Sequence, residues 1–155
     1  MKLALVTETY PPEVNGVAMT LSRLVEGMSA RGHTVEVVRP RQCSGDEGSN
    51  DTDAHIEQVA LPGLPIPRYE GLHFGLPARW KLQERWEEDR PDVVHIATEG
   101  PLGITALGAA EQLGIPVTSS FHTNFHQYSK HYASGLIEGP VMWYLRWVHN
   151  RCGVT

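Results

Sequence analysis

Cysteine is scarce in this 155-residue chain, which contains only Cys43 and Cys152, far apart and outside any CxxC spacing. This scarcity argues against a disulfide framework and against a thiolate metal site. Basic residues are outnumbered, with 13 Lys and Arg against 18 Asp and Glu, so the sequence offers no general attraction to nucleic acid. No apolar run approaches the roughly 18 residues of a membrane span, and Leu3 to Val6 is too short for a signal peptide. We therefore expect a cytoplasmic protein whose membrane contact, if any, is peripheral and on the inner face.

Two common phosphate-binding signatures are also lacking. No GxGxxG follows the first apolar run, and neither GKS nor GKT follows Gly16, which argues against a dinucleotide fingerprint and a P-loop. The composition, 41% hydrophobic and 20% charged, is that of a globular domain with a sizeable core.

Short apolar runs alternate with stretches of helical periodicity along the whole chain. We predict strands over residues 2–7, 34–39, 56–61, 92–97 and 115–121, and helices that begin near residues 16, 78, 101 and 139. Residues 41–53 and 62–77 have loop composition. The alternation predicts an α/β fold, a Rossmann-like, doubly wound, mainly parallel sheet with helices on both faces and ligands at the carboxyl ends of the strands. Because the sequence stops where a new strand should begin, we expect residues 1–155 to be a single domain of a longer protein.

The loop after the first strand delivers Gly16 to the first turn of a helix. Backbone N–H groups and the positive end of the helix dipole favour a phosphate there, and a glycine lets it approach the backbone. The alternative is that Asn15 is simply the N-cap and Gly16 a tolerated turn residue.

A second polar cluster, Ser119 to Tyr132, follows the last predicted buried strand. Its mixture of polar and aromatic side chains can bind sugar hydroxyls and cover sugar rings, although a capped helix start with solvated histidines is an equal alternative. His122 and His126 have the spacing of a metal pair, but a third ligand is not evident and we predict no metal site. Glu99, after the fourth strand, either binds an acceptor hydroxyl or favours a helix N-terminus by its charge.

Two tryptophans, Trp143 and Trp147, lie four residues apart on the last predicted helix, away from its main apolar stripe. Burial in the core is the preferred explanation. Contact with another domain or with a membrane interface would use the same aromatic surface.

Three segments together, TETYPPEVNGVAMTLSRLVEGMSARGHTVEVVRP, RPDVVHIATEGPLG and FHTNFHQYSKHY, resemble the N-terminal domain of retaining glycosyltransferases of family four. This family includes GDP-mannose-dependent α-mannosyltransferases. The resemblance implies a GT-B architecture, in which two Rossmann-like domains face each other across the catalytic cleft. The chain would supply the acceptor-side wall, whereas the donor pocket and its E-x7-E motif belong to a C-terminal domain outside this sequence.

The resemblance also implies residue roles. Asn15, Gly16 and Val17 would approach the donor diphosphate, and His122 would be the catalytic residue that contacts the transferred sugar. The acceptor-binding residues would be Tyr10, Glu99, Thr123, Tyr128 and Lys130. The implied partners are a nucleotide sugar, GDP-mannose being the analogy, and a glycan or lipid acceptor. Hexosyl transfer would proceed with retention and without a metal or other cofactor. Alternatives are a non-catalytic sugar-binding or interaction module and a GT-B nucleotide-sugar epimerase or phosphorylase.

Overall fold

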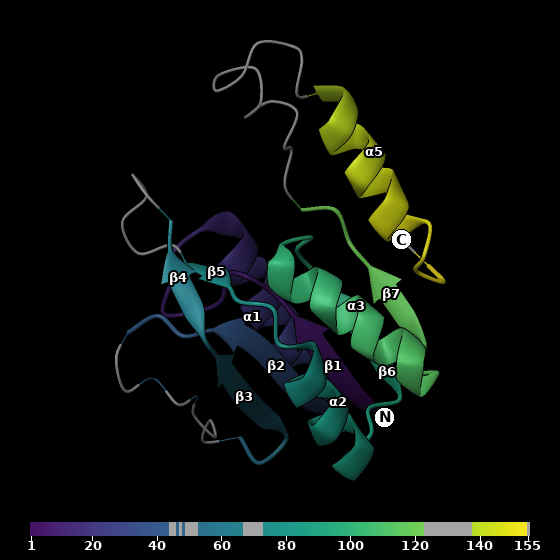
Figure 1. Ribbon diagram of the computed structural model, residues 1–155. Helices are drawn as coiled ribbons and strands as arrows, with labels where there is room; N and C mark the ends of the chain where they lie inside the picture. The colour runs from purple at the N-terminus through teal and green to yellow at the C-terminus, as the bar shows by residue number, and fades with distance from the viewer. Residues whose placement is uncertain (44–45, 47, 49–52, 67–72, 123–137, 155) are drawn as a thin grey trace.

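The computed structural model describes residues 1–43, 46, 48, 53–66, 73–122 and 138–154. Its main feature is a five-stranded parallel sheet with the strand order β3-β2-β1-β6-β7. The strands are β1 (Lys2–Val6), β2 (Thr34–Pro40), β3 (Ile56–Leu61), β6 (Val93–Ile96) and β7 (Val117–Ser119). Helix α1 (Gly16–Ser29) covers one face, and α2 (Arg79–Glu88) and α3 (Pro101–Leu113) cover the other (Figure 1). The predicted Rossmann-like, doubly wound α/β fold is confirmed.

The central strand β1 shows why both faces of the sheet are covered. Successive side chains of a strand point to opposite faces. Leu5 accordingly packs in the cluster that holds Leu21 and Val25 of α1, whereas Val6 packs in the cluster that holds Leu107 of α3. A continuous apolar run is therefore what this position in a parallel sheet requires.

The prediction of an irregular connection over residues 62–77 is wrong in part. Strands β4 (Gly63–Pro65) and β5 (His73–Gly75) form a two-stranded antiparallel sheet there. Three residues are too few to establish a period of two, so the sequence pattern could not indicate these strands. The hairpin lies close to the main sheet, since a Cβ on Gly63 would lie 2.8 Å from Cβ of Pro40.

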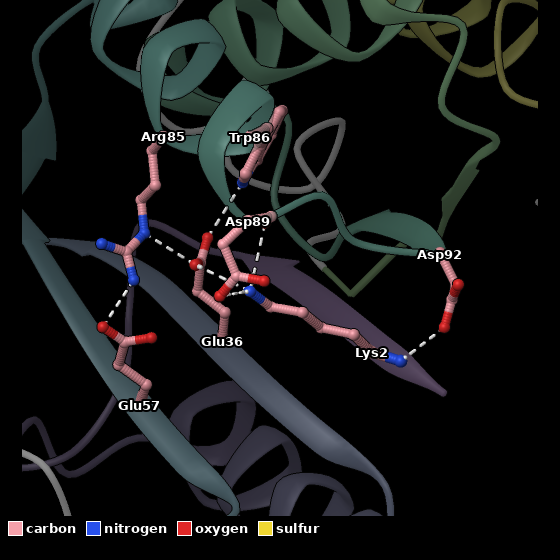
Figure 2. Close-up of polar contacts among 7 residues, drawn as sticks. All are labelled: Lys2, Glu36, Glu57, Arg85, Trp86, Asp89 and Asp92. Carbon is pink, nitrogen blue, oxygen red and sulfur yellow. Dashed lines mark hydrogen bonds and ion pairs between the residues drawn. The ribbon is translucent and has the colours of Figure 1, made fainter.

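Helix α2 buries Leu82 and Trp86 in the apolar core, and polar contacts around one buried carboxylate also join it to the sheet. Glu36 of β2 has no exposed surface and accepts hydrogen bonds from Nε1 of Trp86 at 2.9 Å and Nε of Arg85 at 2.7 Å. The ammonium group of Lys2 lies 4.0 Å from the same carboxylate (Figure 2). Arg85 also pairs with Glu57 of β3, so charges from three strands meet beneath the helix.

The last helix, α5 (Glu138–His149), packs on the α3 side of the sheet through Tyr144 and Val148. Burial of its two tryptophans in the core is contradicted, because Trp143 is 67% exposed and Trp147 is 36% exposed. The guanidinium of Arg151 instead stacks over the Trp147 ring, 4.6 Å from its centroid. None of the helices in the described ranges is both long enough and apolar enough to cross a membrane.

Candidate functional site

The strand order reverses between β1 and β6, and in sheets of this type the ligand-binding crevice is expected at the carboxyl ends of the two strands. The chain runs outward from β1 to β3 and then returns to β6 on the other side of β1. The loops that leave these two strands are joined there, because the backbone N–H of Glu8 donates to the Thr98 hydroxyl at 2.7 Å. The segments around Gly16 and His122 both follow carboxyl ends of strands in this sheet, so they lie along the same edge.

Helix α1 begins at this edge with unpaired donors. Asn15 caps the helix by accepting the N–H of Ala18 at 2.8 Å, as its residue type predicts. The N–H groups of Gly16 and Val17 have no hydrogen-bond partner in the described part of the chain, and no acidic residue occurs in the first turn. A Cβ on Gly16 would meet no atom within 4 Å. The helix terminus is therefore open to an anion.

The loop that precedes α1 is braced internally. The Thr9 hydroxyl donates to Glu13 and accepts from Nδ2 of Asn15 at 2.6 Å, which fixes the N-cap side chain. Burial raises the pKa of Glu13, and the hydrogen bond from Thr9 opposes this effect. Tyr10 is only 4% exposed and packs in the α1 core cluster, while its carbonyl accepts from Gln42. Its acceptor-binding role stays a prediction.

Glu8, to which the sequence reasoning gave no role, links three segments at the crevice. Its carboxylate accepts the N–H of Leu102 at 2.9 Å, in the first turn of α3, and also the N–H of Gly75 in β5. A Cβ on Gly100 would lie 2.1 Å from its Oε1, so a side chain at position 100 would displace the Glu8 carboxylate. Burial raises the pKa of Glu8 to about 7. Its place directly after the first buried strand is the signal that could have identified it.

Glu99, a predicted acceptor-binding residue, is 3% exposed and engaged by α5. Oε1 of Glu99 lies 2.8 Å from Nε2 of His149, and Nδ1 of His149 lies 2.8 Å from the Ser119 hydroxyl. The Tyr144 hydroxyl donates to the backbone carbonyl of Glu99. Burial raises the pKa of Glu99, and hydrogen bonds from its own backbone and from His149 oppose that rise. The order Ser-His-Glu has the connectivity of a hydrolase triad, but Ser119 is 4% exposed, so these bonds join α5 to the strands.

His122, the predicted catalytic residue, is exposed just beyond β7. Its Nε2 lies 2.7 Å from the Ser120 hydroxyl, which lies 3.0 Å from Nε2 of His95 in β6. Burial, and secondly the charge of His122, lower the pKa of His95. Ser120 was predicted only as a member of the polar cluster Ser119 to Tyr132. His95 was given no role, although a histidine inside a buried strand is a recognisable signal. Four residues considered from the sequence lie outside the described residues: Thr123, His126, Tyr128 and Lys130.

A metal site finds no support in the ranges that the structure describes. No group of three or more His, Cys, Asp or Glu side chains is placed there to hold a metal ion. Whether the reaction requires a metal is a separate question, so metal independence stays a prediction.

The model of Glycosyltransferase Family 4 matches residues 14–155 of this chain. The chain belongs to Glycosyltransferase Family 4. This family-four chain is 30% identical over 161 residues to a GDP-mannose-dependent alpha-mannosyltransferase of Corynebacterium glutamicum, in a match that covers 100% of the chain and 37% of that protein. It is 34% identical over 138 residues to an alpha-monoglucosyldiacylglycerol synthase of Acholeplasma laidlawii, with 88% of the chain and 33% of that protein covered. The chain thus spans about a third of the length of these relatives.

Solved structures support the fold of the family-four chain. A sucrose-phosphate synthase from Thermosynechococcus elongatus superposes with a TM-score of 0.63 at 13% identity, over 95% of this chain and 39% of that chain. A UDP-GlcNAc 2-epimerase from Methanocaldococcus jannaschii gives a TM-score of 0.53 at 16% identity, over 96% and 38% of the respective chains. At these identities the likeness is evidence for the fold alone.

Proposed function

We propose that the full-length protein is a glycosyltransferase that moves a hexosyl group from a nucleotide sugar to a glycan or lipid acceptor, with retention of configuration. The family assignment supports this activity, and the relative named as a GDP-mannose-dependent alpha-mannosyltransferase makes mannose the first sugar to test. A second relative, named for a glucosylated diacylglycerol, keeps lipid acceptors among the candidates. The chain would form the acceptor-side wall of the cleft, and its own C-terminal domain would bind the nucleotide.

The observation that carries the proposal is the open start of α1. The unpaired N–H groups of Gly16 and Val17 would donate to the donor diphosphate, and the absence of a side chain at Gly16 leaves room for it. The helix dipole favours the negative charge that grows on this group as the glycosidic bond breaks. Asn15 would keep the terminus in place by capping Ala18.

The chemistry would depend on positioning rather than on a carboxylate pair. The leaving diphosphate itself can take the acceptor proton, so the transfer needs neither a metal nor another cofactor. His122, exposed at the same edge, would contact the transferred sugar. Glu99 is covered by His149, so we assign it to the support of the acceptor side rather than to direct proton transfer. We place the enzyme in the cytoplasm, peripheral to the inner membrane face if its acceptor is a lipid.

Substitution of Gly16 by leucine in the full-length protein tests the diphosphate site. We expect kcat/KM for the donor to fall roughly 10- to 100-fold, because the side chain would displace charge-assisted hydrogen bonds worth about 1.5–3 kcal/mol. Folding should be unaffected, since nothing lies within 4 Å of the new Cβ. The assay is transfer of labelled mannose from GDP-mannose, with UDP-glucose in parallel.

The matched control is Gly27→Ala, near the other end of α1. A Cβ on Gly27 meets only the end of the Arg31 side chain, at 3.4 Å, so this variant should keep full activity. Normal turnover in Gly16→Leu would contradict the diphosphate site. Consumption of the nucleotide sugar without a new glycosidic bond would indicate an epimerase, and sugar binding without turnover would indicate a binding module.

A further inference from the structure

A chain of three hydrogen bonds connects His122 to the interior of the sheet. The Thr118 hydroxyl of β7 lies 2.8 Å from Nδ1 of His95, and Nε2 of His95 lies 3.0 Å from the Ser120 hydroxyl. That hydroxyl lies 2.7 Å from Nε2 of His122. Each distance is that of a sound hydrogen bond, and both ring nitrogens of His95 are used.

The chain has a preferred direction because each group has a limited number of protons. Burial is the main cause that lowers the pKa of His95, so at neutral pH its ring has a single N–H. If Thr118 donates to His95, then His95 donates to Ser120 and Ser120 donates to His122, so every proton in the chain has an acceptor. The opposite direction leaves the Thr118 hydroxyl proton without a protein acceptor among the residues that the structure describes. An unpaired, partly buried donor is the less favourable state.

We propose that Thr118, His95 and Ser120 are positioning residues that hold neutral His122 in the tautomer protonated at Nδ1. Because Nε2 of His122 accepts from Ser120, Nδ1 is the ring nitrogen left for a ligand, and it offers a proton. In the proposed glycosyltransferase, on which this role rests, Nδ1 of His122 would donate a hydrogen bond to an oxygen of the bound sugar or phosphate. Because its unprotonated Nε2 faces Ser120, His122 would not take a proton from the ligand.

The tautomer can be measured without any substrate. Long-range ¹H–¹⁵N spectra of the full-length protein, labelled with ¹⁵N-histidine, distinguish protonated from unprotonated ring nitrogens. Roughly two pH units above the ordinary histidine pKa, the wild-type His122 should show a protonated Nδ1 and an unprotonated Nε2. His122→Gln identifies its signals by their loss.

Three variants test the role of the chain. Ser120→Ala should shift His122 towards the Nε2-protonated tautomer that solvated histidine favours, and Ser120→Thr should restore the wild-type state because it keeps a hydroxyl. Thr118→Val should shift the same equilibrium although Thr118 does not contact His122, an effect that a merely structural role would not produce. Thr34→Val, at the exposed start of β2, is the matched control and should change nothing.

The proposal is overturned if wild-type His122 has its proton on Nε2, or if both Ser120→Ala and Thr118→Val leave its tautomers unchanged. Should Ser120→Ala fail to fold, the wild-type spectrum and Thr118→Val decide the matter. A correct tautomer in a protein that transfers no sugar would contradict the proposed function alone. In an active enzyme we expect Ser120→Ala to lower kcat roughly tenfold with little change in donor KM.

Discussion

The buried carboxylate of Glu36 should stabilise the attachment of α2 more than any surface ion pair does. Glu36→Gln keeps the volume of the side chain and keeps an amide oxygen that can accept from Trp86. Its NH₂ group cannot accept from Arg85, so the 2.7 Å charge-assisted hydrogen bond is lost. Arg85 retains Glu57 as a partner, and Lys2, whose ammonium lies 4.0 Å from the Glu36 carboxylate, retains Asp89, so the hydrogen bond from Arg85 is the main loss.

The expected magnitude follows from that single loss. A hydrogen bond to a charged group contributes about 1.5–3 kcal/mol, and removal of a buried charge returns part of its desolvation free energy. We therefore expect local opening of α2 to become easier by about 2 kcal/mol. That difference corresponds to roughly thirtyfold faster hydrogen exchange of the α2 amides.

Hydrogen-exchange mass spectrometry of the full-length protein measures this effect in the peptide that covers α2. Glu111→Gln is the control, because it breaks a surface pair whose side chains, Arg151 and Glu111, are 40% and 33% exposed. Such pairs contribute about 0–1 kcal/mol, so exchange near Glu111 should change only severalfold at most. The reasoning about the buried carboxylate is refuted if Glu36→Gln changes hydrogen exchange in α2 no more than Glu111→Gln changes hydrogen exchange in α3, the helix that contains Glu111.

Three further predictions concern the crevice. The pKa of Glu8 is raised from 4.5 to about 7, so folding favours its protonated form. The stabilisation from this protonated carboxyl, about 3 kcal/mol, is fully present below pH 4.5 and is lost as the pH rises through about 7. The difference in urea midpoint between wild type and Glu8→Gln should vary over this range, and a constant difference would contradict it. Gly103→Ala should destabilise the protein by about 1–3 kcal/mol and lower its Tm, because its Cβ would lie 2.4 Å from the Thr98 carbonyl oxygen; an unchanged Tm argues against that close approach. Asn15→Ala should cost about 1 kcal/mol and speed exchange in the first turn of α1, whereas Asn15→Asp should not; equal exchange in both variants would exclude the cap.

Local sequence patterns were sufficient for most of the fold. Apolar runs such as Leu3 to Val6 lie within strands, and Asn15 followed by Gly16 marks the start of α1. These features depend on residues within one element, whose period and capping are fixed by nearby backbone geometry. The alternation of strands and helices then allows few topologies other than a parallel sheet. The position of Gly16 at the carboxyl edge follows from that topology.

The partners within the candidate site were decided by tertiary structure alone. His95 and Ser120 are 25 residues apart, and His149 and Glu99 are 50 apart, so no local pattern relates them. The attachment of α2 through Glu36 was equally hidden, because a charged residue in an otherwise apolar strand gives no indication of which helix will cover it. Sequence determines which segments form strands and helices, since those depend on neighbouring residues. Packing determines which polar groups meet, because a buried donor or acceptor must find its partner on whichever element lies against it.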